Sequence, residues 1–387
     1  MTMTPRERVL TAINHGEPDR VPIVIGVSNA TGLKMPPYRR LADLLGIVAA
    51  DRYLYDWPEL GTAAPDEAML RRLGSDVRGV LDSFPDWVLE RRRNRPPDAP
   101  FIDDWGTGQV KVRDGTWYPG VHPLSDAETL DALERYPWPD MDDPSRVAHV
   151  REEAARLAEQ HEYAIMATPW LLFPFERAVA MQGLEQILMN MAVNPEFAEA
   201  LLRRLAGLCK QLMGHFLREL GEDVDIIKIG DDLGTEESLL MSPAMYRRIL
   251  KPIHADYISF IRERTPAKVF FHTDGDVSAL LDDFVEIGVD ILNPIQTSSG
   301  GMADIAGVKR RYGSRLAFCG GIDTQRVLPQ GSPEDVRQEV RRVIELLAPG
   351  GGYLLAAVHT IMDEVPAQNI LAMVDAVEEF GRYPIRA

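Results

Sequence analysis

Short apolar runs and longer amphipathic segments alternate along most of the chain. The apolar runs lie at 20–27, 163–169, 224–232, 267–275, 289–296, 315–323 and 351–360. Each run is continuously apolar instead of alternating with polar residues, which is typical of parallel strands buried on both faces. The segments between the runs carry helix signals: Ser242-Pro243 and Ser332-Pro333 suit helix starts, and Gly288 suits a helix end. The pattern predicts a parallel sheet with helices on its faces.

Capping residues place several of these helices. Thr4, Pro5 and Glu7 form a capping pattern that begins the first helix. A long helical stretch over 174–220 is expected to break near Asn194-Pro195, where a cap is followed by a first-turn proline. Further helices are expected at 146–160, 243–264, 277–288, 302–313, 333–348 and 366–381.

The number of strands decides the architecture. The seven runs, with an eighth strand hidden between residues 75 and 105 (76–82 is the candidate), favour an α/β fold of the closed (β/α)₈ TIM-barrel type. A doubly wound open sheet is the alternative. That fold calls for a glycine-rich phosphate loop after an early strand, and the sequence contains none.

Residues 30–145 break the regular pattern, because they are rich in Pro, Asp and Trp. We expect loops, short helices and a small hairpin around 108–118, with Asp114-Gly115 at its turn. This loop-rich stretch is interpreted as an N-terminal elaboration that covers the mouth of the barrel, within one domain spanning 1–387. A small separate domain is the other interpretation.

Composition and charge narrow the functional classes. The chain is 45% hydrophobic and 26% charged, as in globular proteins, and its 42 basic and 59 acidic residues give a net charge of −17. That balance argues against binding nucleic acid or an anionic membrane surface. There is no bilayer-spanning apolar run and no secretory signal, and the two cysteines, Cys209 and Cys319, do not indicate a disulfide. A cytoplasmic location is therefore expected.

Polar and reactive residues follow the predicted strands at their carboxyl ends. They are Asp231, Asp232, His272, Asp274, Asn293, Gln296, Cys319 and His359. In barrels these strand ends form the active site. Five consecutive strands thus deliver functional side chains to one face of the molecule.

The strongest candidate chemistry is a metal site. His272 and Asp274 are two residues apart, so they share one side of a strand, and Cys319 arrives two strands later. Imidazole, carboxylate and thiolate together suit Zn²⁺, and three protein ligands leave one position open for catalysis. The alternative is structural: a small cysteine packs in the core, and His272 hydrogen-bonds a neighbour.

The other strand-end residues have candidate roles beside this site. Asp231, Asp232 and His359 are candidates for proton transfer, with turn capping and a structural histidine as the alternatives.

Substrate contacts and a further ligand are also expected. Asn293 and Gln296 are candidates for hydrogen bonds to substrate, with ordering of the loop around Pro294 as the alternative. Trp105, in the aromatic-rich elaboration, is a candidate for an aromatic pocket wall, with a buried structural tryptophan as the alternative. Glu176 is either a fourth metal ligand or an acidic residue favoured at a helix N-terminus.

Five motifs in order carry a family resemblance. RERVLTAINHGEPDRVP, GDDLGT, FFHTDGDVSALLDDFVEIGVDILNPIQ, FCGGIDTQ and HTIMDEVPAQNILAMVDAVEEFG resemble the uroporphyrinogen decarboxylase superfamily, which has a (β/α)₈ barrel. True decarboxylases of this superfamily use no cofactor and carry an arginine motif, R-Q-A-G-R-Y, after the first strand. Here the matching stretch is IGVSNATGLK, which has no arginine. The resemblance is therefore to the other branch, the corrinoid-dependent methyltransferases.

The methyltransferase branch implies a zinc site and a partner protein. Its members show H-x-C on one strand and a cysteine at the end of a later one; His272 and Cys319 match, whereas Asp274 replaces the first cysteine. The implied function is zinc-assisted transfer of a methyl group (O-demethylation) from a small methoxylated or related donor to a corrinoid (cobalamin) carried by a partner protein. The alternatives are a metal-independent decarboxylase or lyase acting on a small or tetrapyrrole acid, and a ligand-sensing module without catalysis. The oligomeric state stays open, with a homodimer as one arrangement.

Overall fold

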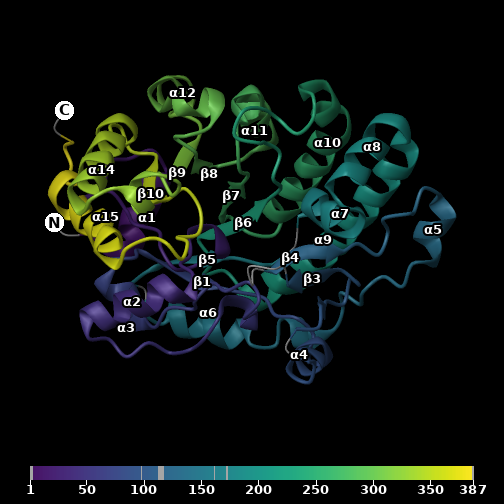
Figure 1. The fold of residues 1–387 in the computed structure, drawn as a ribbon. Coiled ribbons are helices and arrows are strands. Elements are labelled where there is room, and N and C mark those ends of the chain that lie inside the picture. The colour runs from purple at the N-terminus through teal and green to yellow at the C-terminus, as the bar shows by residue number, and fades with distance from the viewer. Residues whose placement is uncertain (1–2, 97, 112–116, 161, 171–172, 386–387) are drawn as a thin grey trace.

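A curled parallel sheet forms the centre of the computed structural model, which describes residues 3–96, 98–111, 117–160, 162–170 and 173–385 (Figure 1). The strand order is β1-β5-β6-β7-β8-β9-β10, so each strand pairs with the next one along the chain. The strands are β1 (Val77–Val80), β5 (Ala164–Ala167), β6 (Ile226–Gly230), β7 (Lys268–His272), β8 (Ile291–Ile295), β9 (Ala317–Ile322) and β10 (Tyr353–Ala357). The predicted α/β barrel is confirmed, including the eighth predicted strand, which is β1.

The predicted strand at 20–27 takes the place between β10 and β1 without forming a regular ladder. The Val24 N–H donates to the Leu355 carbonyl at 2.9 Å, and the Leu355 N–H donates to the Pro22 carbonyl at 2.8 Å. On the other side, the Asp76 N–H donates to the Ile23 carbonyl at 2.9 Å. Pro22 has no N–H to donate, and the Ile23 N–H is bonded to the Asp76 side chain, so the ladder is interrupted.

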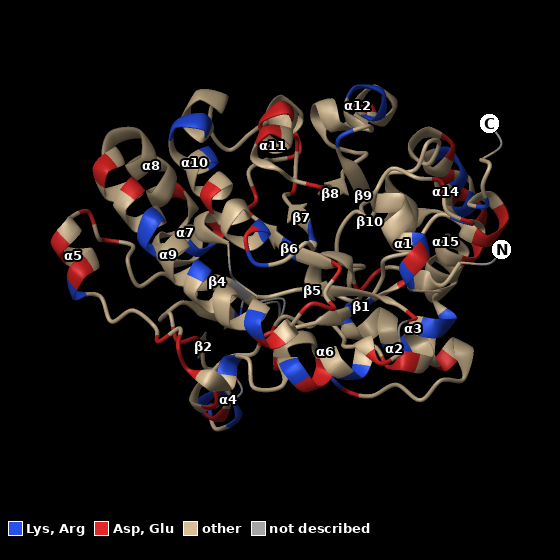
Figure 2. Cartoon of the chain, turned by 180° about the vertical axis from the view of Figure 1, so that it is seen from behind, with Lys and Arg blue, Asp and Glu red and all other residues tan. Residues whose placement is uncertain are grey.

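Helices surround the sheet, and charged side chains lie mainly on these outer helices and on the loops (Figure 2). The α-helices are α1 (Pro5–Ile13), α2 (Met35–Leu45), α3 (Glu67–Arg72), α4 (Asp86–Arg93), α5 (Leu130–Arg135), α6 (Val150–Ala158), α7 (Pro174–Gln182), α8 (Leu184–Val193), α9 (Pro195–Leu220), α10 (Pro243–Arg262), α11 (Leu281–Ile287), α12 (Ile305–Tyr312), α13 (Val327–Gln330), α14 (Pro333–Leu347) and α15 (Ala367–Phe380). Short 3₁₀ helices lie at η1 (Asn29–Thr31), η2 (Leu54–Asp56), η3 (Pro144–Arg146), η4 (Ser278–Leu280) and η5 (Gly300–Ala303). None of the described helices combines the length and the apolar character that crossing a bilayer demands.

Local sequence signals account for the helix boundaries. The predicted capping box at Thr4 and Glu7 is present, and Ser242 and Ser332 cap α10 and α14. The predicted break at Asn194 separates α8 from α9. A second break, which the sequence pattern did not reveal, lies at Gly183, whose φ of 84° favours glycine.

The barrel has two apolar cores. One fills the interior of the barrel and is built from alternate strand residues, among them Phe270, Ile291 and Cys319. The larger core lies between the sheet and its helices. This division places alternate residues of each strand inside the barrel, and the next interior position after Phe270 is His272.

The segment 30–145 contains β1 of the barrel together with α2 to α5 and a small antiparallel sheet. That sheet has the order β2 (Phe101–Ile102), β3 (Gly108–Lys111) and β4 (Trp117–Val121). The predicted hairpin is confirmed by the pairing of β3 with β4, and its predicted turn at Asp114-Gly115 lies outside the described residues. β4 packs against α7, whose N-terminus lies at the mouth of the barrel (Figure 1).

Candidate metal centre at the mouth of the barrel

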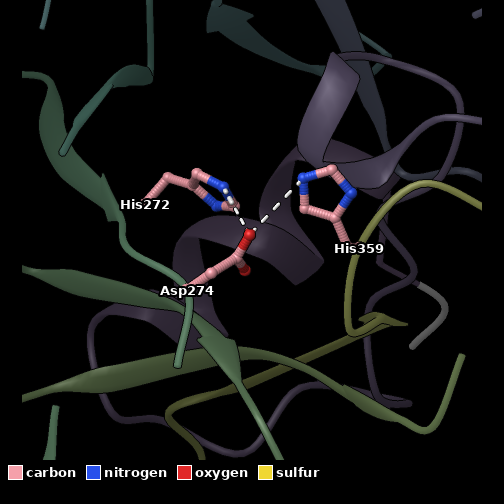
Figure 3. A group of neighbouring side chains, drawn as sticks. All are labelled: His272, Asp274 and His359. Atoms are coloured by element: carbon pink, nitrogen blue, oxygen red, sulfur yellow. Dashed lines mark ion pairs between the residues drawn. The ribbon is translucent and has the colours of Figure 1, made fainter. Parts of the chain in front are cut away.

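Two histidines and an aspartate converge where the strands end. His272 is the last residue of β7, Asp274 follows two residues later, and His359 comes two residues after β10. In Figure 3 the Asp274 carboxylate points between the two imidazoles: its Oδ2 lies 3.8 Å from His272 Nε2 and 3.7 Å from His359 Nε2. One ligand atom from each residue lies within 4.8 Å of the others. The three side chains therefore form a group that can close around a metal ion.

Asn293 fixes which nitrogen of His272 faces this group. Asn293 Nδ2 donates to the Cys319 carbonyl at 3.3 Å, so Asn293 Oδ1 faces His272 Nδ1, at 2.7 Å. An amide oxygen can only accept, so Nδ1 must carry the proton and donate it. The lone pair of neutral His272 is then on Nε2, which faces Asp274. This is the tautomer and the outer hydrogen bond that metal-binding histidines have.

Both histidines are held in the neutral form. Burial lowers the pKa of His272 well below its ordinary value, and the charge of Lys228 and the neighbouring His359 act in the same direction. Burial lowers the pKa of His359 to about 4, and Lys228 and Lys34 contribute. The two imidazoles are thus free of the added proton at neutral pH, as metal binding requires.

The Asp274 carboxyl has no lysine or arginine within ion-pair distance in the described part of the chain. Burial raises its pKa well above the ordinary value, and repulsion by Asp232 raises it further. Its Oδ1 atom is buried and has no hydrogen-bond partner among the described residues. A buried carboxylate oxygen without a partner beside two neutral imidazoles is what a cation would satisfy. The residues present therefore fit a zinc ion, with one carboxylate and two nitrogen ligands.

An acidic cluster with one lysine lies next to this group. Asp232 Oδ1 accepts the Asp274 N–H at 3.0 Å and lies 3.9 Å from His272 Nε2. Glu176, in the first turn of α7, has its pKa raised well above the ordinary value by burial and by repulsion from Asp232. The Lys228 ammonium projects from β6 and lies 4.7 Å from the centre of the Phe173 ring, and burial lowers its pKa. The site thus holds more carboxyl groups than cations.

The structure does not bring Cys319 to the metal group. Its side chain is buried in the apolar interior of the barrel, and its strand partner is Leu354. Burial raises the pKa of its thiol to about 12, so the thiolate that zinc binding needs is disfavoured. The third member of the group in the structure is His359, which we expected to act in proton transfer, and Cys319, the expected third ligand, lies outside the group.

Two other predicted residues, Asp231 and Asn293, are engaged within the protein. Both oxygens of Asp231 accept backbone N–H groups at the start of α7, those of Phe175 at 3.1 Å and Glu176 at 2.7 Å, and Oδ2 also lies 2.8 Å from His254 Nε2. Asp231 therefore anchors α7 and does not line the cavity described below, in contrast to Asp232. Asn293 uses both of its polar groups on His272 and Cys319, so it orients a candidate ligand and does not face substrate.

The last two predicted substrate contacts are also placed elsewhere. Gln296 Oε1 accepts the Gly275 N–H at 2.8 Å and thereby holds the loop after Asp274. Trp105 is buried in the main core, stacked under the Arg177 guanidinium, and borders a separate and much smaller cavity.

A cavity of about 1140 Å³ opens above the metal group. Glu176, Asp232 and His359 line it from the barrel side. The opposite walls come largely from residues 29–61 and 101–109, with Trp117 and Pro119, so the elaboration does cover the mouth of the barrel. Six aromatic side chains line the cavity: Tyr53, Trp57, Phe101, Trp117, Trp170 and Phe175. The cavity is large enough for a substrate with an aromatic ring.

Two contributors to the site were missed from the sequence. Lys228 is a lone lysine within the apolar run 224–232, and it shares strand parity with Asp232, which could have marked it as an interior residue. Lys34 lines the cavity from the start of α2, and no motif singles it out.

Comparisons with known proteins agree with the fold. A family model described as uroporphyrinogen decarboxylase (URO-D) matches residues 108–380. The chain is 25% identical to the uroporphyrinogen decarboxylase of Methylococcus capsulatus over 219 residues, which cover 55% of this chain and only 58% of that protein. It is 23% identical to the uroporphyrinogen decarboxylase of Alkalilimnicola ehrlichii over 392 residues, which cover 98% and 96% of the two chains. A solved methyltransferase from Methanosarcina mazei has the same fold, with a TM-score of 0.66 and 20% identity over 98% of this chain and 99% of that one.

Proposed function

This chain belongs to the uroporphyrinogen decarboxylase (URO-D) family, and on that basis we propose that it is a zinc-dependent methyltransferase. It would take a methyl group from a small methoxylated or related donor and pass it to the corrinoid of a partner protein. The observation that carries this proposal is the group formed by His272, Asp274 and His359, in which the buried Asp274 Oδ1 has no hydrogen-bond partner in the part of the chain that the structure describes. Decarboxylation without a cofactor has no need of such a ligand set, whereas the methyltransferase branch that the sequence resembles binds zinc.

His272, Asp274 and His359 would hold the ion, and Asn293 would keep the His272 Nε2 lone pair directed at it. A zinc ion bound there supplies Lewis acidity, which makes an ether oxygen a better leaving group. Two neutral imidazoles and a carboxylate donate less negative charge to the ion than thiolates do, so the ion would remain a stronger Lewis acid. This donor set therefore favours activation of an oxygen-bound methyl group.

The chain's own residues would manage the proton that the reaction needs. When the methyl group leaves, the C–O bond breaks with its electron pair on oxygen, and that oxygen takes up a proton. Glu176 lines the cavity, and burial raises its pKa, which favours the protonated carboxyl, so it is suited to donate. Lys228, whose charge acts to lower the pKa of Glu176, would then stabilise the carboxylate that remains.

The cavity walls would position the donor. Trp57 lies edge-on to Trp170, with ring centres 5.0 Å apart, and edge-on to Phe101 at 5.7 Å. Interlocked rings of this kind form a rigid apolar wall, against which the ring of an aryl methyl ether would pack. A donor packed against this wall would displace water from the cavity, which would strengthen the electrostatic interactions at the metal group.

The test combines metal analysis with single-turnover methyl transfer. Purified protein should contain about one zinc per chain, and His359→Ala and Asp274→Asn should each remove most of it. The zinc-loaded protein should convert cob(I)alamin to methylcobalamin in the presence of methoxylated donors, measured by the change in corrinoid absorption. Metal-free protein that releases CO₂ from a carboxylic acid would overturn the proposal in favour of a lyase.

A further inference from the structure

Lys34 stands at the edge of the cavity in a position fixed from both sides. Its backbone N–H donates to the Ile361 carbonyl at 2.9 Å, two residues beyond His359. A second bridge pairs Lys34 with Thr62. The side chain lines the cavity, and its ammonium donates to the Leu60 carbonyl. An ammonium has three N–H groups, so two remain for another acceptor.

Among the described residues that line the cavity, the other arginines and lysines have carboxylate partners, whereas Lys34 has none. Arg39 is paired with Asp51 at 2.6 Å, and Arg177 with Asp103 at 3.1 Å. Asp363 also lines the cavity and acts on the pKa of Lys34, but it is exposed to solvent and forms no ion pair with it within 4.0 Å. Burial lowers the pKa of Lys34, as expected for a cation that has lost water without gaining a counter-ion.

The charge of Lys34 acts on the histidine side of the site. Burial and Lys228 lower the pKa of His359, and Lys34 lowers it further, whereas Lys228 is the only lysine that contributes to the pKa shifts of Glu176, Asp232 and Asp274 among the described residues. Met35 and Pro36 continue the cavity wall, so the N-terminus of α2, the positive end of the helix dipole, lies at the same place. The cavity thus has an electropositive corner that is separate from its acidic cluster.

We propose that Lys34 receives an anionic group of the substrate, and that the methyl donor is a methoxylated aromatic carboxylic acid. The aromatic walls accommodate the ring, and the carboxylate pairs with the ammonium of Lys34. This assignment rests on the proposed methyltransferase function for the identity of the reacting methoxy group. The recognition of the carboxylate by Lys34 depends only on the cavity.

The experiment compares two ligands of the same shape and different charge. Binding of 4-methoxybenzoate and of the neutral 4-methoxybenzamide to the zinc-loaded protein is measured by calorimetry, with tryptophan fluorescence as a second readout because Trp57, Trp117 and Trp170 line the cavity. We expect the wild type to bind the acid about 10-fold more tightly than the amide. Lys34→Met should reduce this ratio to about 2-fold or less with little change for the amide, and Lys34→Arg should keep most of it.

A matched control lies outside the cavity. Lys210 forms an ion pair with Asp256 on the outer surface of α9, so Lys210→Met should leave the ratio unchanged. Equal binding of acid and amide by the wild type, binding of neither, or an unchanged ratio in Lys34→Met would each overturn the proposal. The binding assay contains no corrinoid, so it tests Lys34 independently of methyl transfer. An acid preference that depends on Lys34 in this assay, together with no methyl transfer in the single-turnover assay with cob(I)alamin, would refute the proposed function alone. Methyl transfer from neutral ethers at the same rate as from acids would refute the Lys34 assignment alone.

Discussion

Replacing Asn293 with leucine should weaken zinc binding although Asn293 is not itself one of the ligands. The side chain is fully buried and makes two hydrogen bonds, to His272 Nδ1 at 2.7 Å and to the Cys319 carbonyl at 3.3 Å. Leucine fills a similar volume and can make neither bond. The Nδ1–H of His272 then has no acceptor inside the protein, which costs about 1–3 kcal/mol.

The effect on metal affinity follows from the tautomer of His272. Without the Asn293 oxygen, the imidazole can rotate and can carry its proton on Nε2, where it would block metal binding. Loss of an outer hydrogen bond of this kind lowers metal affinity about 10–100-fold. That range corresponds to about 1.4–2.7 kcal/mol of binding free energy. It is measured by titrating zinc against a competing chelator at neutral pH, and the melting temperature of the metal-free protein gives the stability cost separately.

Asn369 offers a matched control for this substitution. It is equally buried, and its Nδ2 donates to the carbonyls of Leu328 and Gly331, each at 2.8 Å, with no contact to the metal group. Asn369→Leu should therefore lower stability by a similar amount and leave zinc affinity unchanged. If Asn293→Leu binds zinc within about 2-fold of the wild type, Asn293 does not set the tautomer, and the reasoning fails.

Three further outcomes are expected. Cys319→Ala should keep its full zinc content and lose about 1–2 kcal/mol of folding stability, because a core side chain is shortened. His359→Ala should lose the zinc, and metal analysis of both proteins checks this difference. Zinc loss in Cys319→Ala would show that the thiol is a ligand. Zinc affinity should rise with pH up to the raised pKa of Asp274 and level off above it, since below that pKa a proton competes for the carboxylate, while both histidines are already neutral. Calorimetric zinc titrations of the wild type over a series of pH values measure this, and an affinity that does not change with pH would contradict it. Glu176→Gln should slow single-turnover methyl transfer about 100-fold without loss of zinc, because it keeps the shape but cannot donate the proton; an unchanged rate would exclude Glu176 as the donor.

The repeating part of the fold was predictable from local patterns. The apolar runs of the second half became β5 to β10, and capping residues placed the helices between them. The closing segment at 20–27 was less predictable, because its pairing depends on Pro22 and on the buried Asp76 carboxylate, which occupies the Ile23 N–H. Local hydrophobicity does not reveal that a side chain competes with strand pairing for a backbone N–H group.

The site was predictable as a location but not as an exact set of residues. Side chains at the carboxyl ends of barrel strands were expected to converge, and His272, Asp274 and His359 do. Cys319 also projects into the barrel, yet it lies deeper, within an apolar layer. Depth depends on the stagger between neighbouring strands, which strand parity alone does not give. The position of Lys34 depends on a backbone hydrogen bond to Ile361, which lies more than 300 residues later in the sequence.

The metal group and the opposite wall of the cavity come from different parts of the sequence. The candidate ligands all lie within 272–359, inside the stretch 108–380 that matches the family model, whereas Lys34, Tyr53, Trp57 and Phe101 precede that stretch. Substituting the cavity-lining side chains of this segment would therefore alter which molecules are admitted while leaving the metal group in place. For protein engineering, substrate choice and the reactive group can be changed separately, provided that the barrel strands at 20–27 and β1 are kept.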